Sequence, residues 1–389
     1  MKKYFYFSML MIVSGIFQAP AQESLSTQDL VSPEVGKDGR VTFRLNAPEI
    51  REAKLTGDWM PQDGSDRAAA AMERGAEGVW TYTTGPLPSE IYWYHFLVDG
   101  VRTLDPANAH TIRDVASVFN LFIVPGDPGG LYSVQPVSHG TVHKRWYDSP
   151  GLGMKRRMTI YTPPGYEVSG QEYPVLYLLH GAGGDEEAWS DLGRATQILD
   201  NLIASGKAQP MIVVMPNGNP GDEAAPGHAT GPLVQPAFMR PGMMQGDYIT
   251  SFGDIIDFVQ SNYRAKAGKE HRAIAGLSMG GFHSLHISRY YPETFDYIGL
   301  FSPAIMPRNN EEDPAFRNMD ETLKAQRDNV YELYWIGIGK DDFLYDEVTA
   351  YRKRLNGMKM PYEYHETEGG HVWHLWREYL SIFSQLLFR

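Results

Sequence analysis

One serine of the chain lies in a sequence that could make it a nucleophile. Residues 276–280 read GLSMG, the pattern G-x-S-x-G with Ser278 at its centre. The pattern is weak by itself, but an apolar run at 272–275 precedes it and a helix-forming stretch at 282–291 follows it. This order of strand, tight turn and helix is that of a nucleophile elbow. We therefore predict that Ser278 is a nucleophile, with an ordinary glycine-rich turn as the alternative.

A serine hydroxyl needs a base to accept its proton, and His371 is the best-placed histidine. It follows the sequence EGG, after a strand-like run and before a C-terminal helix. A histidine on such a glycine-rich loop can reach over the strand ends toward Ser278. His374 is the alternative base, although we expect it on the helix. His283 and His286 are expected to be packing or solvent-facing residues of the helix after the serine.

The base needs an acid that holds its tautomer and stabilises the imidazolium ion. Asp341 and Asp342 follow the apolar run 333–338, at a strand end where an acid would be presented. They also lie between the serine and the histidine, which is the order of this type of site along the chain. We favour Asp342, because Asp341 could be a solvated turn residue or a helix cap.

A tetrahedral intermediate needs two backbone N–H groups to hold its oxyanion. One should come from Met279, the residue after the nucleophile. The other should come from the sequence HGAGG at 180–184, which follows the apolar run 175–179, and we choose Ala182. A phosphate-binding loop is the rival interpretation, but the segment lacks the lysine of a P-loop and the spacing of a dinucleotide fingerprint.

The elements that would position these residues follow from the pattern after residue 139. Strands of the buried type alternate with helix-length segments; the apolar runs are at 175–179, 211–215, 272–275, 297–301 and 333–338. Such alternation indicates a mostly parallel sheet with helices on both faces. We therefore predict one α/β catalytic domain over residues 139–389.

The N-terminal part of the chain has a different pattern. Residues 30–126 contain short runs in which apolar and polar positions alternate, and Asp99-Gly100 follows the longest of them. Asp-Gly between apolar runs is a strong hairpin signal, and several such strands without helical periodicity favour a small all-β sandwich. Residues 127–138 are rich in Pro and Gly, so we predict a linker there.

The first 21 residues resemble a secretory signal peptide. Lys2 and Lys3 precede an apolar stretch at 4–17, and the sequence Ala-Pro-Ala at 19–21 offers a cleavage site. The apolar stretch is shorter than the roughly 20 residues that span a bilayer, so a membrane anchor is the weaker interpretation. We expect export to the periplasm or the extracellular space.

Composition excludes several classes of function. The chain of 389 residues carries 35 basic and 47 acidic side chains, a formal net charge of -12. Such a surface repels phosphate backbones, so no nucleic-acid partner is expected. The chain has no cysteine, which excludes disulfides, thiolate metal sites and a lipoprotein anchor. No cofactor or metal is implied, and the sequence does not indicate an oligomeric state.

The segment 139–389 resembles the esterase D-like α/β-hydrolases, which include the feruloyl esterases of carbohydrate esterase family 1. Besides HGAGG and GLSMGG, the matching sequences are at 161–166, 173–181 and 370–377. The resemblance implies that Ser278, Asp342 and His371 form the triad, with Met279 and Ala182 around the oxyanion. The sequences at 41–48, 57–59 and 104–108 look like the immunoglobulin-like, glycogen-binding-type module often fused to such esterases.

The resemblance implies a secreted serine esterase that acts on plant cell-wall polysaccharide or oligosaccharide esters. Feruloyl or related hydroxycinnamoyl groups on xylan are the first expectation. The alternatives are a siderophore esterase of the enterobactin type, an acetylxylan esterase, and a carbohydrate-binding protein with an inactive hydrolase domain.

Two further features bear on the substrate. Residues 216–246 are rich in Pro and Gly and end in apolar side chains, so we expect a long loop there. This loop either forms one wall of a site for an aromatic acyl group or only packs on the domain. Trp59, Trp80 and Trp93 of the N-terminal part could stack on sugars, but core packing or inter-domain contact is favoured for the last two.

Overall fold

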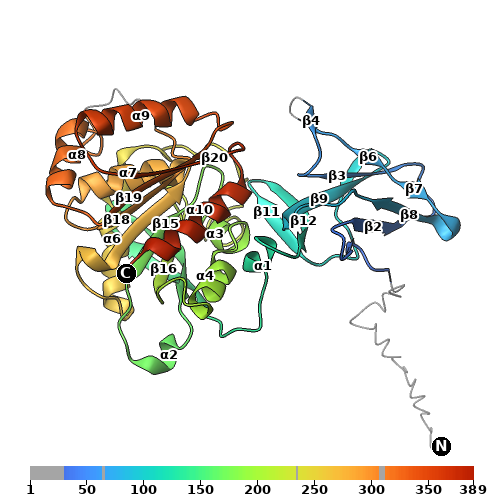
Figure 1. Cartoon of the computed structure of the whole chain (residues 1–389), viewed down its shortest axis with the longest axis horizontal. Helices are drawn as coiled ribbons and strands as arrows, with labels where there is room; N and C mark the ends of the chain where they lie inside the picture. The colour runs from blue at the N-terminus through green and yellow to red at the C-terminus, as the bar shows by residue number, and fades with distance from the viewer. Residues whose placement is uncertain (1–29, 64–65, 234, 306–311) are drawn as a thin grey trace, which may run out of the picture.

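The computed structural model describes residues 30–63, 66–233, 235–305 and 312–389. The predicted signal peptide at 1–21 lies outside these ranges. The chain forms two lobes, an all-β lobe from the N-terminal part and a larger α/β lobe (Figure 1). In the described ranges, no helix combines the length and the apolar character that a bilayer-spanning segment needs.

The N-terminal lobe contains two facing antiparallel sheets. In spatial order the first sheet consists of β1 (Glu34–Val35), β2 (Val41–Asn46), β8 (Val79–Thr83) and β7 (Glu73–Arg74). The second consists of β11 (Thr111–Asp114), β12 (Ser117–Val124), β9 (Glu90–Val98), β3 (Ala53–Gly57) and β6 (Ala70–Ala71), with β10 (Val101–Thr103) paired to β9. A small hairpin of β4 (Gln62–Asp63) and β5 (Asp66–Arg67) lies beside them.

The alternating pattern explains this sandwich. In β2 the side chains of Val41, Phe43 and Leu45 are buried while the intervening residues are not, because successive strand residues face opposite sides. They pack against aromatic residues of the second sheet, including Tyr94. The predicted Asp99-Gly100 turn joins β9 to β10, and both residues have the positive φ angles of a tight hairpin, 46° and 82°.

The larger lobe is built on a mixed sheet of eight strands. In spatial order they are β13 (Thr141–Ser149), β14 (Met154–Thr162), β16 (Ile212–Pro216), β15 (Val175–Leu179), β17 (Arg272–Leu277), β18 (Tyr297–Phe301), β19 (Leu333–Gly339) and β20 (Glu363–Thr367). The six strands β16, β15, β17, β18, β19 and β20 are parallel to one another, while β13 and β14 are antiparallel to their neighbours.

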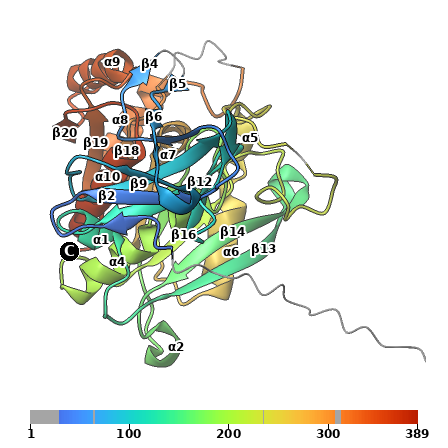
Figure 2. The same ribbon diagram turned by 90° about the vertical axis from the view of Figure 1, so that its right-hand side faces the viewer.

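Helices cover both faces of this sheet, as the sequence pattern predicts (Figure 2). One face packs on α5 (Gly246–Thr250), α6 (Phe252–Asn262), α7 (Met279–Tyr290), α8 (Met319–Asp328) and α9 (Tyr345–Gly357). The other packs on α1 (Gly129–Tyr132), α3 (Ala188–Asp191), α4 (Ala195–Ala204) and α10 (Trp373–Leu386), while α2 (Tyr166–Ser169) lies between β14 and β15 in the chain. All five residues of β15 are buried, which explains its unbroken apolar sequence.

The segment predicted as a linker is packed against the larger lobe. Tyr132 of α1 is only 1% exposed. The side chain of Arg194 donates to the Tyr132 carbonyl at 3.1 Å, and Asn201 donates to the carbonyls of Leu131 and Ser133. These contacts with α4 and its N-cap fix the path of the chain between the lobes.

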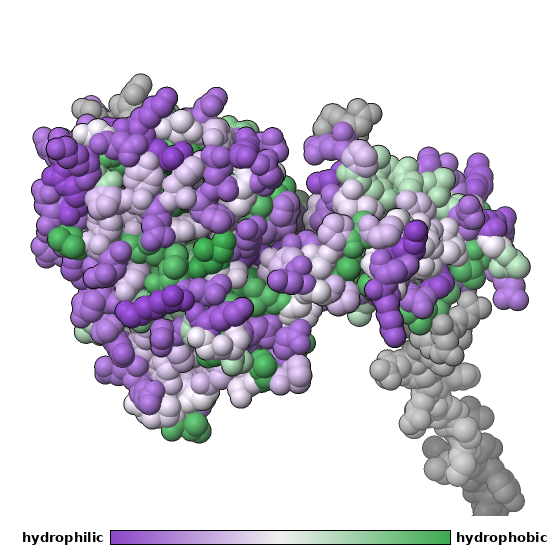
Figure 3. Space-filling view, in the orientation of Figure 1, coloured by the Kyte–Doolittle hydropathy of each residue, from purple (hydrophilic) through white to green (hydrophobic). Residues whose placement is uncertain are grey.

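The two lobes meet at a waist narrower than either of them (Figure 3). Ile91, Ile112 and Leu121 of the N-terminal lobe belong to the same apolar cluster as α10 and α4. Beside this contact, Arg377 of α10 donates to Glu90 of β9 at 3.0 Å and to the Leu192 carbonyl at 2.9 Å. A buried ion pair and an apolar contact therefore join the lobes.

Removing one partner of this ion pair should strongly destabilise the protein. The side chains of Arg377 and Glu90 are only 6% and 15% exposed, so the Glu90→Ala variant leaves a buried guanidinium without its carboxylate. We expect the free energy of unfolding to fall by about 3–5 kcal/mol, measured by denaturant titration. The exposed Glu73→Ala change in β7 is the control. An unaltered midpoint in Glu90→Ala would show that the ion pair does not hold the lobes together.

Candidate active site

The candidate nucleophile occupies a strained turn between β17 and α7. Ser278 has φ 52° and ψ −112°, a conformation that non-glycine residues rarely adopt. A Cβ at Gly276 would lie 2.5 Å from the backbone of Gly280, and a Cβ at Gly280 would lie 2.3 Å from the Leu179 carbonyl oxygen. Glycine is therefore required on both sides of the serine, as the sequence pattern suggested, and the turn presents Ser278 at the carboxyl end of the sheet.

The structure brings His371 and Asp342 together. Nδ1 of His371 lies 2.8 Å and 3.0 Å from the two carboxylate oxygens of Asp342. Asp342 follows β19 and is 3% exposed, and one of its oxygens also accepts the backbone N–H of Leu344 at 2.9 Å. Asp341 is exposed, and its backbone N–H bonds to the Gly369 carbonyl. Of the two aspartates, Asp342 therefore holds the imidazole.

Ser278 and His371 both line one cavity of about 1010 Å³. Since Nδ1 of His371 faces Asp342, its other nitrogen, Nε2, is the one left to accept a proton. In the part of the chain that the structure describes, no hydrogen bond joins Ser278 Oγ to His371. Such contacts are often looser without substrate than with it.

His374, the alternative base, also lines this cavity from α10. Burial lowers its pKa, the Glu90 carboxylate opposes that shift, and Arg377 adds to it. No carboxylate holds the His374 ring among the described residues, in contrast to His371. His283 and His286 are buried on α7 and do not line the cavity.

The glycine-rich loop at 181–184 borders the serine. A Cβ at Gly181 would lie 3.4 Å from the Ser278 Cβ, and Ala182 lines the cavity. His180 holds the loop, because its Nδ1–H donates to the Gly181 carbonyl at 2.7 Å and its Nε2 accepts the Gly218 N–H at 2.7 Å. Burial lowers the pKa of His180, which favours the neutral ring that this pair of bonds requires.

Met279 is the first residue of α7 and directly follows the serine. Of the residues predicted to hold the oxyanion, Met279 is therefore adjacent to Ser278 in the chain, and Ala182 follows Gly181 in the loop that borders the serine. A helix N-terminus and a loop with free backbone N–H groups are both suited to a negative oxygen.

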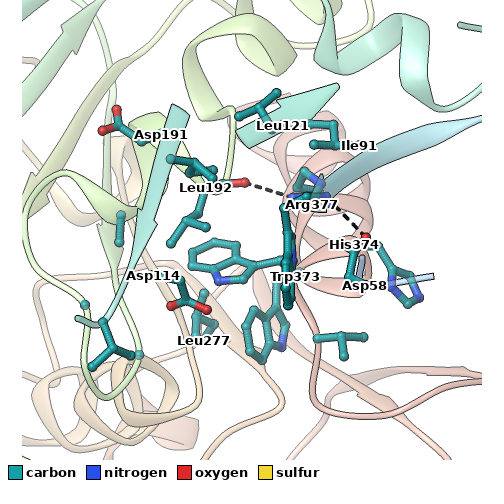
Figure 4. Close-up of a pocket in the computed structure, with 18 of the residues that line it drawn as sticks. Asp58, Ile91, Asp114, Leu121, Asp191, Leu192, Leu277, Trp373, His374 and Arg377 are labelled. Atoms are coloured by element: carbon teal, nitrogen blue, oxygen red, sulfur yellow. Dashed lines mark hydrogen bonds between the residues drawn. The ribbon is translucent and has the colours of Figure 1, made fainter. Parts of the chain in front are cut away.

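Sequence reasoning did not foresee that the N-terminal lobe forms part of the cavity wall. Asp58, Arg113, Asp114 and Val115 of this lobe line the cavity together with Ser278 and residues of α10. Figure 4 labels Asp58 and Asp114 among the lining residues. These residues are polar or lie in short strands and turns, so the sequence alone gave no sign that they face another domain. The signal that could have raised the question is the sequence GDW at 57–59, which the resemblance already singled out.

Some of the tryptophans of the N-terminal lobe and some apolar residues of the 216–246 loop line the cavity, while others are buried in a hydrophobic core. Trp59 and Trp93 line the cavity, whereas Trp80 is 7% exposed and packs in the sandwich. Of the apolar residues near the end of the 216–246 loop, Phe238 lines the cavity and is 58% exposed, while Met243 and Met244 are buried in the core of the larger lobe.

Three comparisons place this geometry among known proteins. A family model described as "Putative esterase" matches residues 149–384. A curated endo-1,4-beta-xylanase/feruloyl esterase of Xylanibacter ruminicola is 31% identical over 287 residues, which cover 72% of this chain and 37% of that protein. The chain thus spans little more than a third of the length of this relative.

Solved structures share the fold. A ferulic acid esterase from Anaeromyces mucronatus, solved with ferulic acid, superposes with a TM-score of 0.54 at 24% identity, over 72% of this chain and 97% of that one. The enterobactin esterase from Shigella flexneri superposes with a TM-score of 0.60 at 17% identity, over 90% of this chain and 94% of that one. At these identities the likeness shows the α/β-hydrolase fold alone.

The cavity carboxyl of Asp58 should make stability depend on pH. Burial raises its pKa from 3.8 to about 7. The hydrogen bond from the backbone N–H of Trp93 and the positive charges of Arg67 and Arg377 lower the pKa but do not cancel the effect of burial. An acid whose pKa is raised by folding destabilises the fold increasingly as pH rises from the unfolded pKa to the folded one. Asp58→Asn keeps an oxygen for the Trp93 N–H, 3.2 Å away, and removes the charge.

We expect the variant to be more stable than the parent by about 2–4 kcal/mol at pH 8. The difference should grow between pH 4 and 7 and then level off, as measured by denaturant unfolding across that range. Asp148→Asn, at a side chain 77% exposed, is the control for lost charge. A difference that does not change with pH would contradict the burial argument.

Proposed function

Because the chain belongs to the family described as "Putative esterase", we propose that it is a serine esterase that hydrolyses feruloyl or related hydroxycinnamoyl esters of plant cell-wall xylan. The observation that carries this proposal is the His371–Asp342 pair, bonded at 2.8 Å in the wall of the cavity that also exposes Ser278. The relative of Xylanibacter ruminicola named as a xylanase and feruloyl esterase supports the choice of substrate.

In the proposed mechanism, His371 Nε2 takes the proton of Ser278 as its oxygen attacks the acyl carbon. Asp342 holds Nδ1–H and stabilises the imidazolium ion. The backbone N–H groups of Met279 and Ala182 hold the oxyanion. The bond to the sugar oxygen then breaks, His371 protonates that oxygen so that it leaves as a hydroxyl, and the acyl group remains on Ser278. Water, deprotonated by His371, repeats the sequence and releases the free acid.

The lining of the cavity supports an aromatic acyl group. Leu277, Phe238, Trp373 and Val372 line it together with Ser278, and such a wall removes a phenyl ring from water. A hydroxycinnamoyl group presents a flat ring of this kind. Phe238 would then act as the wall expected from the end of the 216–246 loop.

We further propose that the N-terminal lobe is an immunoglobulin-like module of the glycogen-binding type. Its two-sheet architecture supports this, and Trp59 and Trp93 would be the residues of the module nearest a bound sugar. The proposal includes export through residues 1–21 to the periplasm or the extracellular space, where cell-wall fragments would be the substrates.

A siderophore esterase is the second candidate. A cavity of about 1010 Å³ has more room than one feruloyl group needs, and the N-terminal lobe lines it. A large cyclic ester could use that room. An acetylxylan esterase has less support, because an acetyl group would leave the aromatic lining without a role.

Substitutions at the site should separate catalysis from folding. Ser278→Ala should lower kcat by roughly 10⁴–10⁶-fold and Asp342→Asn by about 10⁴-fold, while circular dichroism and unfolding midpoints show folded protein. Asp341→Asn, one residue away and exposed, is the matched control and should retain nearly full activity. A large loss in Asp341→Asn with an active Asp342→Asn would reverse the assignment of the acid.

A substrate screen should identify the ester. We expect the purified chain to release ferulate from feruloylated arabinoxylan oligosaccharides faster than it releases acetate from acetylated xylan or opens a catecholate trilactone at equal concentration. Faster turnover of the trilactone would favour the siderophore function. Glycan binding without turnover of any ester would favour a binding protein.

A further inference from the structure

A hairpin of the N-terminal lobe reaches the loop beside the candidate nucleophile. It is formed by β11 and β12, and its tip contains Val115. A Cβ at Gly183 would lie 2.7 Å from a methyl carbon of Val115, so the tip packs directly on the glycine-rich loop. Arg113 strengthens the contact, because it pairs with Asp185 of the larger lobe and donates to the Val115 carbonyl at 2.9 Å.

The backbone of this tip is strained. Val115 has a φ of 51°, in the left-handed region that a β-branched residue rarely enters. Such residues persist only where the surroundings hold them, and they gather at functional sites. Here the surroundings are the glycine-rich loop and the Arg113 side chain. The tip is therefore held in one position with respect to Ser278.

Asp114 precedes the strained residue and lines the cavity that contains Ser278 and His371 (Figure 4). Burial raises the pKa of its carboxyl above the ordinary value, although Arg113 and the Val115 backbone N–H oppose the shift. Among the described residues it forms no ion pair.

Several other carboxylates in the cavity wall have cationic partners. Asp185 pairs with Arg113, Glu90 with Arg377, and Glu187 with Arg157 and Lys144. Asp58 and Asp191 also line the cavity without an ion pair among the described residues, but Asp58 accepts the Trp93 backbone N–H at 3.2 Å and Asp191 accepts the Ser190 hydroxyl at 2.9 Å. Asp114 has the charge of Arg113 and the backbone N–H of Val115 near it, and no side chain in the described part of the chain donates to its carboxylate. Partial desolvation of such a carboxylate is unfavourable unless a donor satisfies it.

We propose that Asp114 is a specificity-determining residue that accepts a hydrogen bond from a hydroxyl group of the bound ester. The N-terminal lobe would thereby select the substrate as part of the active site. This inference rests on the proposed esterase function. The hydroxyl can belong to the phenolic ring of the acyl group or to the sugar of the leaving group, and both offer the same O–H donor.

The test compares Asp114→Ala and Asp114→Asn with the parent on three esters. Methyl cinnamate has no hydroxyl, methyl p-coumarate has one on the acyl ring, and 5-O-cinnamoyl arabinose has hydroxyls only on the sugar. We expect kcat/KM to fall about 10–100-fold in Asp114→Ala for whichever hydroxyl-bearing ester bonds to the carboxylate. It should change less than about 3-fold for methyl cinnamate. Asp114→Asn keeps an acceptor and should recover part of the loss.

The pattern of losses decides the outcome. A loss confined to p-coumarate places the bond on the acyl group, and a loss confined to the arabinose ester places it on the sugar. Equal losses on all three esters, or none, would overturn the proposal, since a structural role does not depend on the substrate hydroxyl. Asp148→Asn controls for lost charge, and unfolding midpoints check the fold.

A binding measurement keeps this result separate from the proposed reaction. If the parent hydrolyses none of the three esters, the proposed function fails. Asp114 is then tested by calorimetry with p-coumarate and L-arabinose in the Ser278→Ala background, with and without Asp114→Ala. Weaker binding after Asp114→Ala supports the hydrogen bond. Unaltered affinity, or no binding of either compound, overturns it.

Discussion

The backbone turn at Ser278 is the constraint on which the site depends. Ser278 has a φ of 52°, and the tight turn around it needs two glycines, since a Cβ at Gly276 would lie only 2.5 Å from the backbone of Gly280. The turn is anchored by the Ser278 N–H, which donates to the Phe301 carbonyl of the neighbouring strand at 2.9 Å. Because β15, β17, β19 and β20 run parallel, the loops that follow them meet at one edge of the sheet.

That edge explains how distant residues come together. The serine follows β17, Asp342 follows β19 and His371 follows β20, and the glycine-rich loop follows β15. A Cβ at Gly339 would lie 2.1 Å from the Gly369 carbonyl oxygen, so glycine at the end of β19 lets the acid loop approach the histidine loop. The parallel sheet fixes the order of the groups, and the glycines set their distances.

The sequence was sufficient for the parts of the fold that local chemistry determines. Five-residue apolar runs such as 175–179 predict buried strands, because both faces of a covered parallel sheet exclude water. The sequence distinguishes Asp341 from Asp342 less well as the catalytic acid, because they are adjacent residues of the same type with nearly the same sequence neighbours. The structure distinguishes them by burial, 3% exposure for Asp342 against an exposed Asp341. Burial depends on the path of the loop, which no local pattern encodes.

The contribution of the N-terminal lobe could not be predicted, for a physical reason. Asp58 and Asp114 stand at strand ends and turns, where carboxylates normally face water. Only the docking of two independently patterned lobes turns these positions toward a shared cavity, and docking depends on contacts between residues hundreds of positions apart, such as Glu90 and Arg377. Burial raises the pKa of both aspartates and disfavours their charged forms. Ion pairs such as Arg113–Asp185 and Glu90–Arg377 satisfy charged groups where the lobes touch. Asp58 and Asp114 have no such partner among the described residues and line the cavity, where a donor of a substrate can reach them.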